Sequence, residues 1–223
     1  MSVALLRRLF RTAGPTQVGR APRPPAGQFQ VAEAAWRDDK LVLSGRLTGP
    51  KRRLVLRHRT NGREQVFPLD AGGDTHTVRL PVTGLPAFGA TLPLPSGDWS
   101  LRGCRWTGQD LPEARAVGLH EFTLRKDGEN RLTLRVRKNL STDEQGPAAQ
   151  AALQSGFYKQ QHAQTVRDMI VFDSMFGKQY SCNPRAIFEE LRRRESNLEF
   201  VWTSADGQFP PPEGARKVLK NSR

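Results

Sequence analysis

The chain of 223 residues is 37% hydrophobic and 26% charged, a composition that can bury a core and excludes a wholly disordered protein. Its formal net charge of +13 favours an anionic partner, but the arginines are scattered along the chain and no homeodomain, zinc-finger, RRM or KH pattern is present, so nucleic acid is disfavoured. No apolar run reaches the roughly 18 residues that span a bilayer, and no signal-peptide pattern is present, so we expect a cytoplasmic protein.

Residues 1–26 form a basic leader and linker. Leu5, Leu6, Leu9 and Phe10 can share one face of a short helix that has arginines beside it. The stretch that follows is rich in proline and glycine, which is typical of a linker. The leader fits either a weak anchor on anionic lipid or a frayed basic terminus.

Residues 27–140 consist of short runs of alternating hydrophobic and polar residues, separated by turn residues. The alternation is strict over 131–137, as in a half-buried strand, and Asn61–Gly62 suits the tight turn of a hairpin. The strands are expected at 29–36, 40–47, 52–59, 64–69, 75–82, 98–106, 120–125 and 131–137. Seven or eight strands at this spacing predict an antiparallel, immunoglobulin-like β-sandwich that acts as an accessory domain.

The tryptophans and cysteines have expected roles of their own. Trp36, Trp99 and Trp106 are expected to fill the core of the sandwich rather than to bind a sugar. Cys104 and Cys182 lie far apart and are expected to be reduced thiols. Two thiols without a histidine cluster predict no metal site, and nothing in the sequence indicates a cofactor.

Residues 141–165 leave the alternating pattern, and their alanine- and glutamine-rich middle predicts a helical connector in which His162 is exposed. Residues 166–223 then predict a strand, a loop, a helix, a second strand at 198–204 and a third at 215–220. The apolar run of the first strand is typical of a parallel strand that is covered on both faces. This order predicts the truncated start of a doubly wound α/β domain, because no helix follows the third strand.

The helix of this unit is predicted to begin with Asn183 as N-cap and Pro184 in its first turn, and to pack on the sheet through Ile187 and Leu191. The loop before it therefore joins the carboxyl end of a strand to the start of a helix. Free backbone N–H groups at such a helix start favour an anion.

Within that loop, Lys178 adds a positive charge, and Gly177 would let the backbone approach a ligand closely. The pattern of a Walker A loop is absent. The sequence thus predicts an anion site here, and the alternative is a lysine on an ordinary βα loop.

The residues of this unit resemble the start of the catalytic domain of the CDP-glycerol glycerophosphotransferase family, the teichoic acid polymerases and primases. The resemblance covers about residues 167–223. The residues that carry it are Asp173, Ser174, Gly177, Lys178, Tyr180, Asn183, Pro184, Phe188, Val201, Trp202, Pro212, Glu213 and Gly214.

The resemblance implies a glycosyltransferase-B-like architecture and an enzyme at the inner face of the cell membrane. It implies transfer of a polyol phosphate from a CDP-glycerol-type donor to a lipid-linked anionic polymer. The catalytic histidines and the donor site of the family lie beyond residue 223, so this chain alone should be inactive. On the acceptor side, the resemblance points to Gly177, Lys178, Tyr180, Asn183 and Arg185 as candidate contacts to phosphate or as scaffold for it.

A second hypothesis assigns the chain a binding role without catalysis. Arg131, Arg135 and Arg137 project from the same side of their strand and could hold an anionic polymer, a membrane surface or a partner protein. Alternatively, these arginines form an ordinary solvated sheet face.

Overall fold

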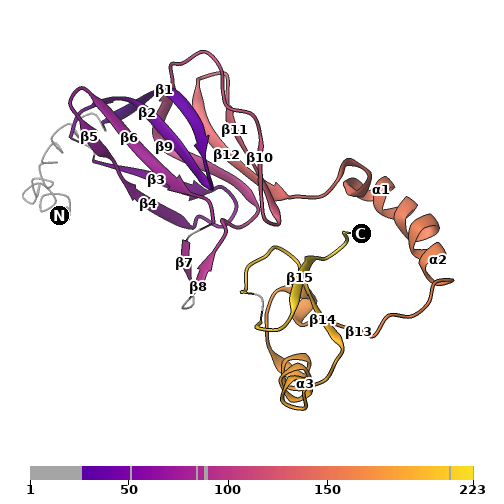
Figure 1. Cartoon of the computed structure of the whole chain (residues 1–223). Helices are drawn as coiled ribbons and strands as arrows, with labels where there is room; N and C mark the ends of the chain where they lie inside the picture. The colour runs from indigo at the N-terminus through magenta and orange to yellow at the C-terminus, as the bar shows by residue number, and fades with distance from the viewer. Residues whose placement is uncertain (1–26, 51, 84, 88–89, 211, 223) are drawn as a thin grey trace, which may run out of the picture.

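The computed structural model of the chain describes residues 27–50, 52–83, 85–87, 90–210 and 212–222. A β-rich region comes first, a helical segment follows it, and a small α/β unit ends the chain (Figure 1). The structure is therefore of mixed α/β class and dominated by sheet. The leader expected over residues 1–26 lies outside the described residues.

All eight strands expected in the β-rich region are present. The strands of this region are β1 (Gln28–Arg37), β2 (Lys40–Thr48), β3 (Arg53–His58), β4 (Glu64–Pro68), β5 (Asp70–Gly72), β6 (Thr75–Pro81), β7 (Leu85–Ala87), β8 (Ala90–Leu92), β9 (Gly97–Trp106), β10 (Arg115–Val117), β11 (His120–Lys126) and β12 (Arg131–Lys138). Strands β5, β7, β8 and β10 have only three residues each and are too short to show periodicity.

Strand β9 organises the larger sheet. Along one edge it pairs with β12, and along the other edge it pairs first with β3 and then with β1. The sheet branches at this point, where Gly103 has a φ of 71°. From β9 it continues through β12, β11 and β10 on one side and through β1, β2, β6 and β5 on the other. The pairing of β1 with β9 is parallel, which the expectation of an antiparallel arrangement did not include.

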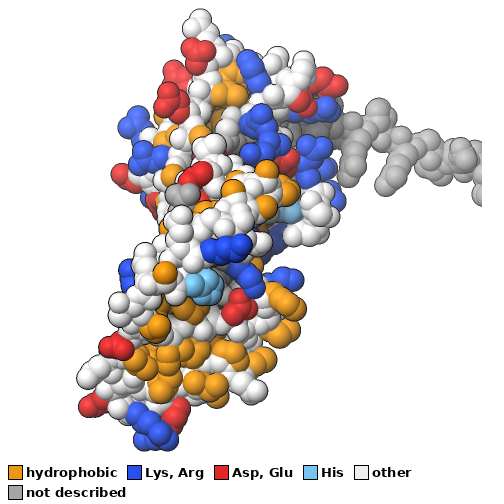
Figure 2. All heavy atoms as spheres, turned by 90° about the vertical axis from the view of Figure 1, so that its right-hand side faces the viewer, with side chains coloured by type: hydrophobic (Ala, Val, Ile, Leu, Met, Phe, Trp, Pro, Cys, Tyr) orange, Lys and Arg blue, Asp and Glu red, His pale blue; other side chains and the backbone are white. Residues whose placement is uncertain are grey.

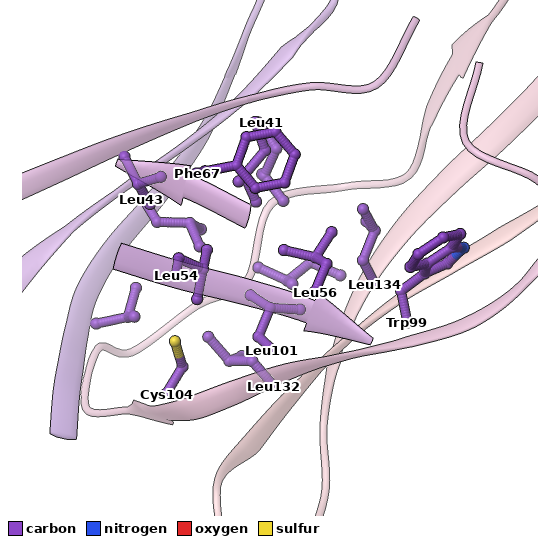
Figure 3. Close-up of a cluster of buried hydrophobic side chains, with 14 of the residues drawn as sticks. Leu41, Leu43, Leu54, Leu56, Phe67, Trp99, Leu101, Cys104, Leu132 and Leu134 are labelled. Atoms are coloured by element: carbon purple, nitrogen blue, oxygen red, sulfur yellow. The ribbon is translucent and has the colours of Figure 1, made fainter. Parts of the chain in front are cut away.

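The inward side chains of both branches form one hydrophobic core (Figure 3). Leu132, Leu134 and Val136 are at most 1% exposed, as the alternation along β12 predicts. Trp99 and Trp106 are buried in this core, which confirms their expected role. Trp36 packs against its edge and donates a hydrogen bond from Nε1 to the carbonyl oxygen of Glu113 over 2.9 Å.

The connector is helical, as expected. A 3-10 turn, η1 (Thr142–Glu144), precedes α1 (Gly146–Ala152), the π-turn η2 (Leu153–Phe157) and α2 (Tyr158–Gln161), and His162 is exposed. The Gln150 amide and the Tyr158 hydroxyl donate hydrogen bonds to the carbonyl oxygens of Asn221 and Ser222 over 3.0 and 3.3 Å. The connector is thereby attached to the end of the α/β unit.

The α/β unit has a parallel sheet in the order β13 (Met169–Phe172), β14 (Glu199–Ser204), β15 (Arg216–Leu219). The 3-10 turn η3 (Met175–Gly177) and helix α3 (Cys182–Arg193) lie between β13 and β14. The core of the unit is aromatic and consists of Phe172, Phe188, Phe200, Trp202 and Phe209.

Three details of the α/β unit differ from the sequence predictions. Helix α3 begins at Cys182 with Ser181 as N-cap, so Asn183 lies inside its first turn. Ile187 is 53% exposed, because the helix packs through Phe188 instead. Val171 is 58% exposed, so the described structure does not cover β13 on both faces.

Hydrophobic side chains gather over the lower, C-terminal part of the molecule in Figure 2.

A polar cluster around the buried His120 joins the two sheet regions. Asp206, which follows β14, accepts hydrogen bonds from the backbone N–H of Ser96 over 2.9 Å and from Nε2 of His120 over 3.0 Å. The Ser96 hydroxyl donates to the same carboxylate. His120 is only 1% exposed, and the sequence patterns had assigned it no role.

None of the described helices combines the length and the apolar character that a membrane crossing requires.

Candidate functional site

The carboxyl ends of the three parallel strands bring polar side chains together at one edge of the sheet. Asp173 follows β13, Thr203 lies near the end of β14, and Lys220 follows β15. The Asp173 carboxylate accepts hydrogen bonds from the Thr203 hydroxyl over 2.8 Å and from the Lys220 ammonium over 2.9 Å. Partial burial opposes ionisation of Asp173, but these donors outweigh it and hold its pKa below the usual value.

The loop after Asp173 has a constrained backbone. Met175 and Phe176 have φ values of 49° and 58°, and such left-handed conformations cost about 1–3 kcal/mol each for residues with a side chain. Both side chains are more than half exposed. The buried Ser174 supports the loop from inside, because its hydroxyl donates a hydrogen bond to the carbonyl oxygen of Ser181 over 2.9 Å.

Gly177 is required by its backbone surroundings. Its φ is 77°, and its carbonyl oxygen accepts a hydrogen bond from the Ala205 N–H over 2.7 Å. A Cβ at this position would lie 2.8 Å from the Ala205 nitrogen. The sequence predicted that the backbone at this glycine approaches a ligand closely. In the structure, the close neighbour is the backbone at the end of β14.

We expect Gly177→Ala to destabilise the α/β unit by about 1–3 kcal/mol, because it combines a left-handed residue with a contact too short for a Cβ. Denaturant unfolding followed by circular dichroism measures this change. Gly156→Ala is the matched control, since nothing lies within 4 Å of a Cβ there and its helical position favours alanine. Equal stabilities of the two variants would contradict the argument.

The structure divides the predicted site residues into two groups. Tyr180 and Arg185 contact one another, with the guanidinium carbon 5.1 Å from the ring centre, and both bind Glu189. Arg185 Nε lies 2.7 Å from the Glu189 carboxylate, so part of its charge is already neutralised. Burial, followed by the negative charge of Glu189, raises the pKa of Tyr180. Tyr180 is therefore a neutral hydrogen-bond donor that helps to orient this pair.

Lys178 and Asn183 form the second group, and both are exposed. Among the residues that the structure describes, no hydrogen bond or ion pair involves the Lys178 ammonium. Asn183 is the second residue of α3. The first turn of this helix contains no acidic side chain, and its N-cap Ser181 makes no capping hydrogen bond, so the turn keeps N–H groups available for an anion.

Lys220 and Thr203 were not among the site residues predicted from the sequence, although both lie at the carboxyl ends of strands. Ligands of open α/β sheets bind at the carboxyl ends of the strands, so this position could have identified Lys220 and Thr203 as candidates. The pairing of Lys220 with Asp173 depends on the register of three strands and could not be deduced from one sequence.

Residues 156–223, which contain this whole edge, match the family described as CDP-Glycerol:Poly(glycerophosphate) glycerophosphotransferase. Through that segment the chain is similar to this family. The resemblance carried by the loop residues is thereby confirmed. The β-rich region lies outside the segment that matches the glycerophosphotransferase family.

Individual proteins give a similar result. The chain is 44% identical over 46 residues to the teichoic acid poly(glycerol phosphate) polymerase of Bacillus subtilis (strain 168), which corresponds to 21% of this chain and 6% of that protein. Crystal structures of S. aureus TarS are more distant. TarS 217–571 has a TM-score of 0.38 at 13% identity over 53% of this chain and 40% of that one. The other TarS structure has a TM-score of 0.35 at 10% identity over 52% and 25%.

Proposed function

We propose that the chain contributes to a transferase of teichoic acid synthesis, which moves glycerol phosphate or a related polyol phosphate from a CDP-glycerol-type donor to a lipid-linked anionic polymer. The observation that carries this proposal is the family match over the segment that contains the loop. Within that segment, Lys178, whose ammonium has no partner among the described residues, lies four residues before the helix α3, whose first turn is free of acids. In this proposal the loop holds a phosphate of the acceptor.

The chemical role of the loop follows from its charges. Lys178 and the N–H groups at the start of α3 would offset the negative charge of an acceptor phosphate. Tyr180, Asn183 and Arg185 would shape the approach to this phosphate, with Arg185 held in place by Glu189. Positioning the acceptor in this way fixes its terminal hydroxyl relative to the donor, which lowers the entropic part of the barrier.

The remaining parts of the architecture belong to the same proposal. Residues 27–140 form an immunoglobulin-like accessory domain, 141–165 a connector, and 166–223 the first part of a doubly wound, glycosyltransferase-B-like catalytic domain. In this proposal, the catalytic histidines and the donor site that the resemblance implies do not belong to the acceptor loop. We therefore infer that the described part of the chain contributes the acceptor site of the transferase, at the inner face of the cell membrane.

Lys178→Ala is expected to weaken binding of a short glycerol phosphate oligomer about tenfold, because one charge-assisted hydrogen bond to phosphate is lost. Phosphorus NMR titration of the full chain measures this affinity. Lys159→Ala removes an exposed lysine of α2 and serves as the control. Equal affinity of the Lys178 variant and the wild type would remove the support for an acceptor site at the loop.

A further inference from the structure

The outer face of the β-rich region has two clefts that share one arginine. The first cleft has a volume of about 560 Å³ and runs along β9 and β12, where it is lined by Arg59, Arg102, Arg105, Asp127 and Arg131 among others. The second has a volume of about 470 Å³ and is lined by Arg59, Thr60, Gly97, Asp98, Arg135, Val136 and Arg137. Arg59 lines both clefts, and we call the two together the arginine cleft.

The alternation of β12 places these arginines on the outside of the sheet. Leu132, Leu134 and Val136 face the core, so Arg131, Arg135 and Arg137 face away from it. The seven residues from Arg131 to Arg137 span about 20 Å at the rise of a strand, so the cleft is elongated.

The positive charge of the cleft exceeds its negative charge. Among the described residues that line it, six are arginines and two, Asp98 and Asp127, are acidic. Arg135 holds Asp98 with hydrogen bonds of 2.8 and 3.2 Å. These bonds come first among the causes that lower the pKa of Asp98, and the charges of Arg59 and Arg125 act in the same direction. Several guanidinium groups therefore surround a single carboxylate.

Part of this charge is available to a ligand. Arg131 is engaged by Asp127 and Glu129 at 2.8 and 3.1 Å. By contrast, Arg59 and Arg137 are exposed and take part in no ion pair among the residues that the structure describes. Guanidinium groups suit phosphate because they offer two parallel N–H donors.

The floor of the cleft indicates which kind of anion fits. Ser100, Gly103 and Thr133 are small residues between the arginines, and two of them carry hydroxyl groups. Among the described residues that line the two clefts, none is aromatic. Proteins that bind single-stranded nucleic acid stack its bases on aromatic rings, so a chain of phosphates and polyols fits this surface better than nucleic acid does.

We propose that the arginine cleft binds a polyol phosphodiester chain of the poly(glycerophosphate) type, and that it holds a stretch of the acceptor polymer apart from the phosphate bound at the loop. This inference rests on the proposed function. It assigns the β-rich region, which lies outside the matched segment, a second binding site for the same polymer. The affinity of the cleft for the polymer should fall with added salt, because exposed charges are screened.

The test compares two double variants of the full chain in binding a synthetic oligo(glycerol phosphate) long enough to span the cleft. Arg59→Gln with Arg137→Gln is expected to weaken binding about tenfold, since each lost contact contributes a fraction of that change. Arg37→Gln with Arg46→Gln removes two exposed arginines of β1 and β2 that line neither cleft, and it should leave the affinity unchanged. Equal affinities of both double variants would overturn the proposal.

Two further comparisons distinguish binding at the cleft from binding at the loop, and binding of the polymer from binding of other anions. Lys178→Ala should reduce binding of the short oligomer, whereas the cleft variant should reduce binding of the long oligomer only. A cleft variant that weakens both ligands equally would overturn the proposal of a separate second site but leave the loop assignment standing. Single-stranded DNA of equal charge, or liposomes with anionic lipid, should bind more weakly than the long oligomer. Tighter binding of either would overturn the assignment of the ligand class.

Discussion

Replacement of Asp206 by alanine is expected to separate the α/β unit from the β-rich region. Asp206 accepts hydrogen bonds from Ser96 and from the almost fully buried His120, and it is the residue through which both are joined to the loop after β14. Removal of the carboxylate leaves the buried His120 without its hydrogen bond, which costs about 1–3 kcal/mol. The Nδ1 atom of His120 already has no partner among the described residues, so the variant leaves this ring without any.

Amide hydrogen exchange measures this separation, as faster exchange in residues around Ser96 and after β14. Asp74→Ala removes an exposed aspartate from the turn between β5 and β6 and serves as the control. Asp206→Asn should have an intermediate effect, because it keeps an acceptor oxygen but loses the charge. Unchanged exchange in the Asp206→Ala variant would show that the cluster does not hold the two regions together.

The hydrogen bonds of Asp206 also predict that the stability of the folded state depends on pH. Burial opposes ionisation of Asp206, but hydrogen bonds from His120 and Ser96 outweigh it and lower its pKa from the ordinary value of 3.8. A carboxylate with a lowered pKa stabilises the folded state above the pKa of the unfolded chain, and this contribution is lost as the pH falls through the folded value. We therefore expect acidification below pH 3.8 to destabilise the wild type more than Asp206→Asn, as urea unfolding at a series of pH values would measure.

Trp202→Ala is expected to unfold the α/β unit and to remove the candidate site with it. Trp202 is fully buried at the centre of the aromatic core, stacked on Phe172 with ring centres 5.2 Å apart. Its ring also packs edge-on against the ring of Tyr180, with ring centres 4.8 Å apart, so the loop contacts the sheet through this pair. Truncation of a buried tryptophan costs about 3–5 kcal/mol, and a unit of this size has little stability to spare.

Denaturant unfolding of the full chain should then show the α/β unit melting before the β-rich region, and the short glycerol phosphate oligomer should no longer bind. Phe176→Ala is the control, because this ring is 77% exposed and its removal should change the stability by less than about 0.5 kcal/mol. A Trp202→Ala protein that keeps wild-type stability would contradict the assignment of this core.

Much of the fold could be predicted from local patterns. The alternation of Leu132, Leu134 and Val136 identified a half-buried strand, since the side chains of a strand point to its two faces in turn. The loop around Gly177 and Lys178 was found in the same way, because a strand, a loop and a helix follow one another within a few residues. The N-cap of α3 was predicted two residues too late, as is common for helix ends, and Ile187 was predicted to pack on the sheet although it is exposed.

The sequence by itself determined the strands, the presence of the helix and the family resemblance of the C-terminal segment, because each depends on residues that are close together in the chain. Only the tertiary structure decided the branching of the sheet at β9, the pairing of Asp173 with Lys220 and the arginine cleft. It also decided the contact between His120 and Asp206, which are 86 residues apart. Such contacts depend on how strands pair and how regions pack, and no periodic pattern in one sequence records that pairing.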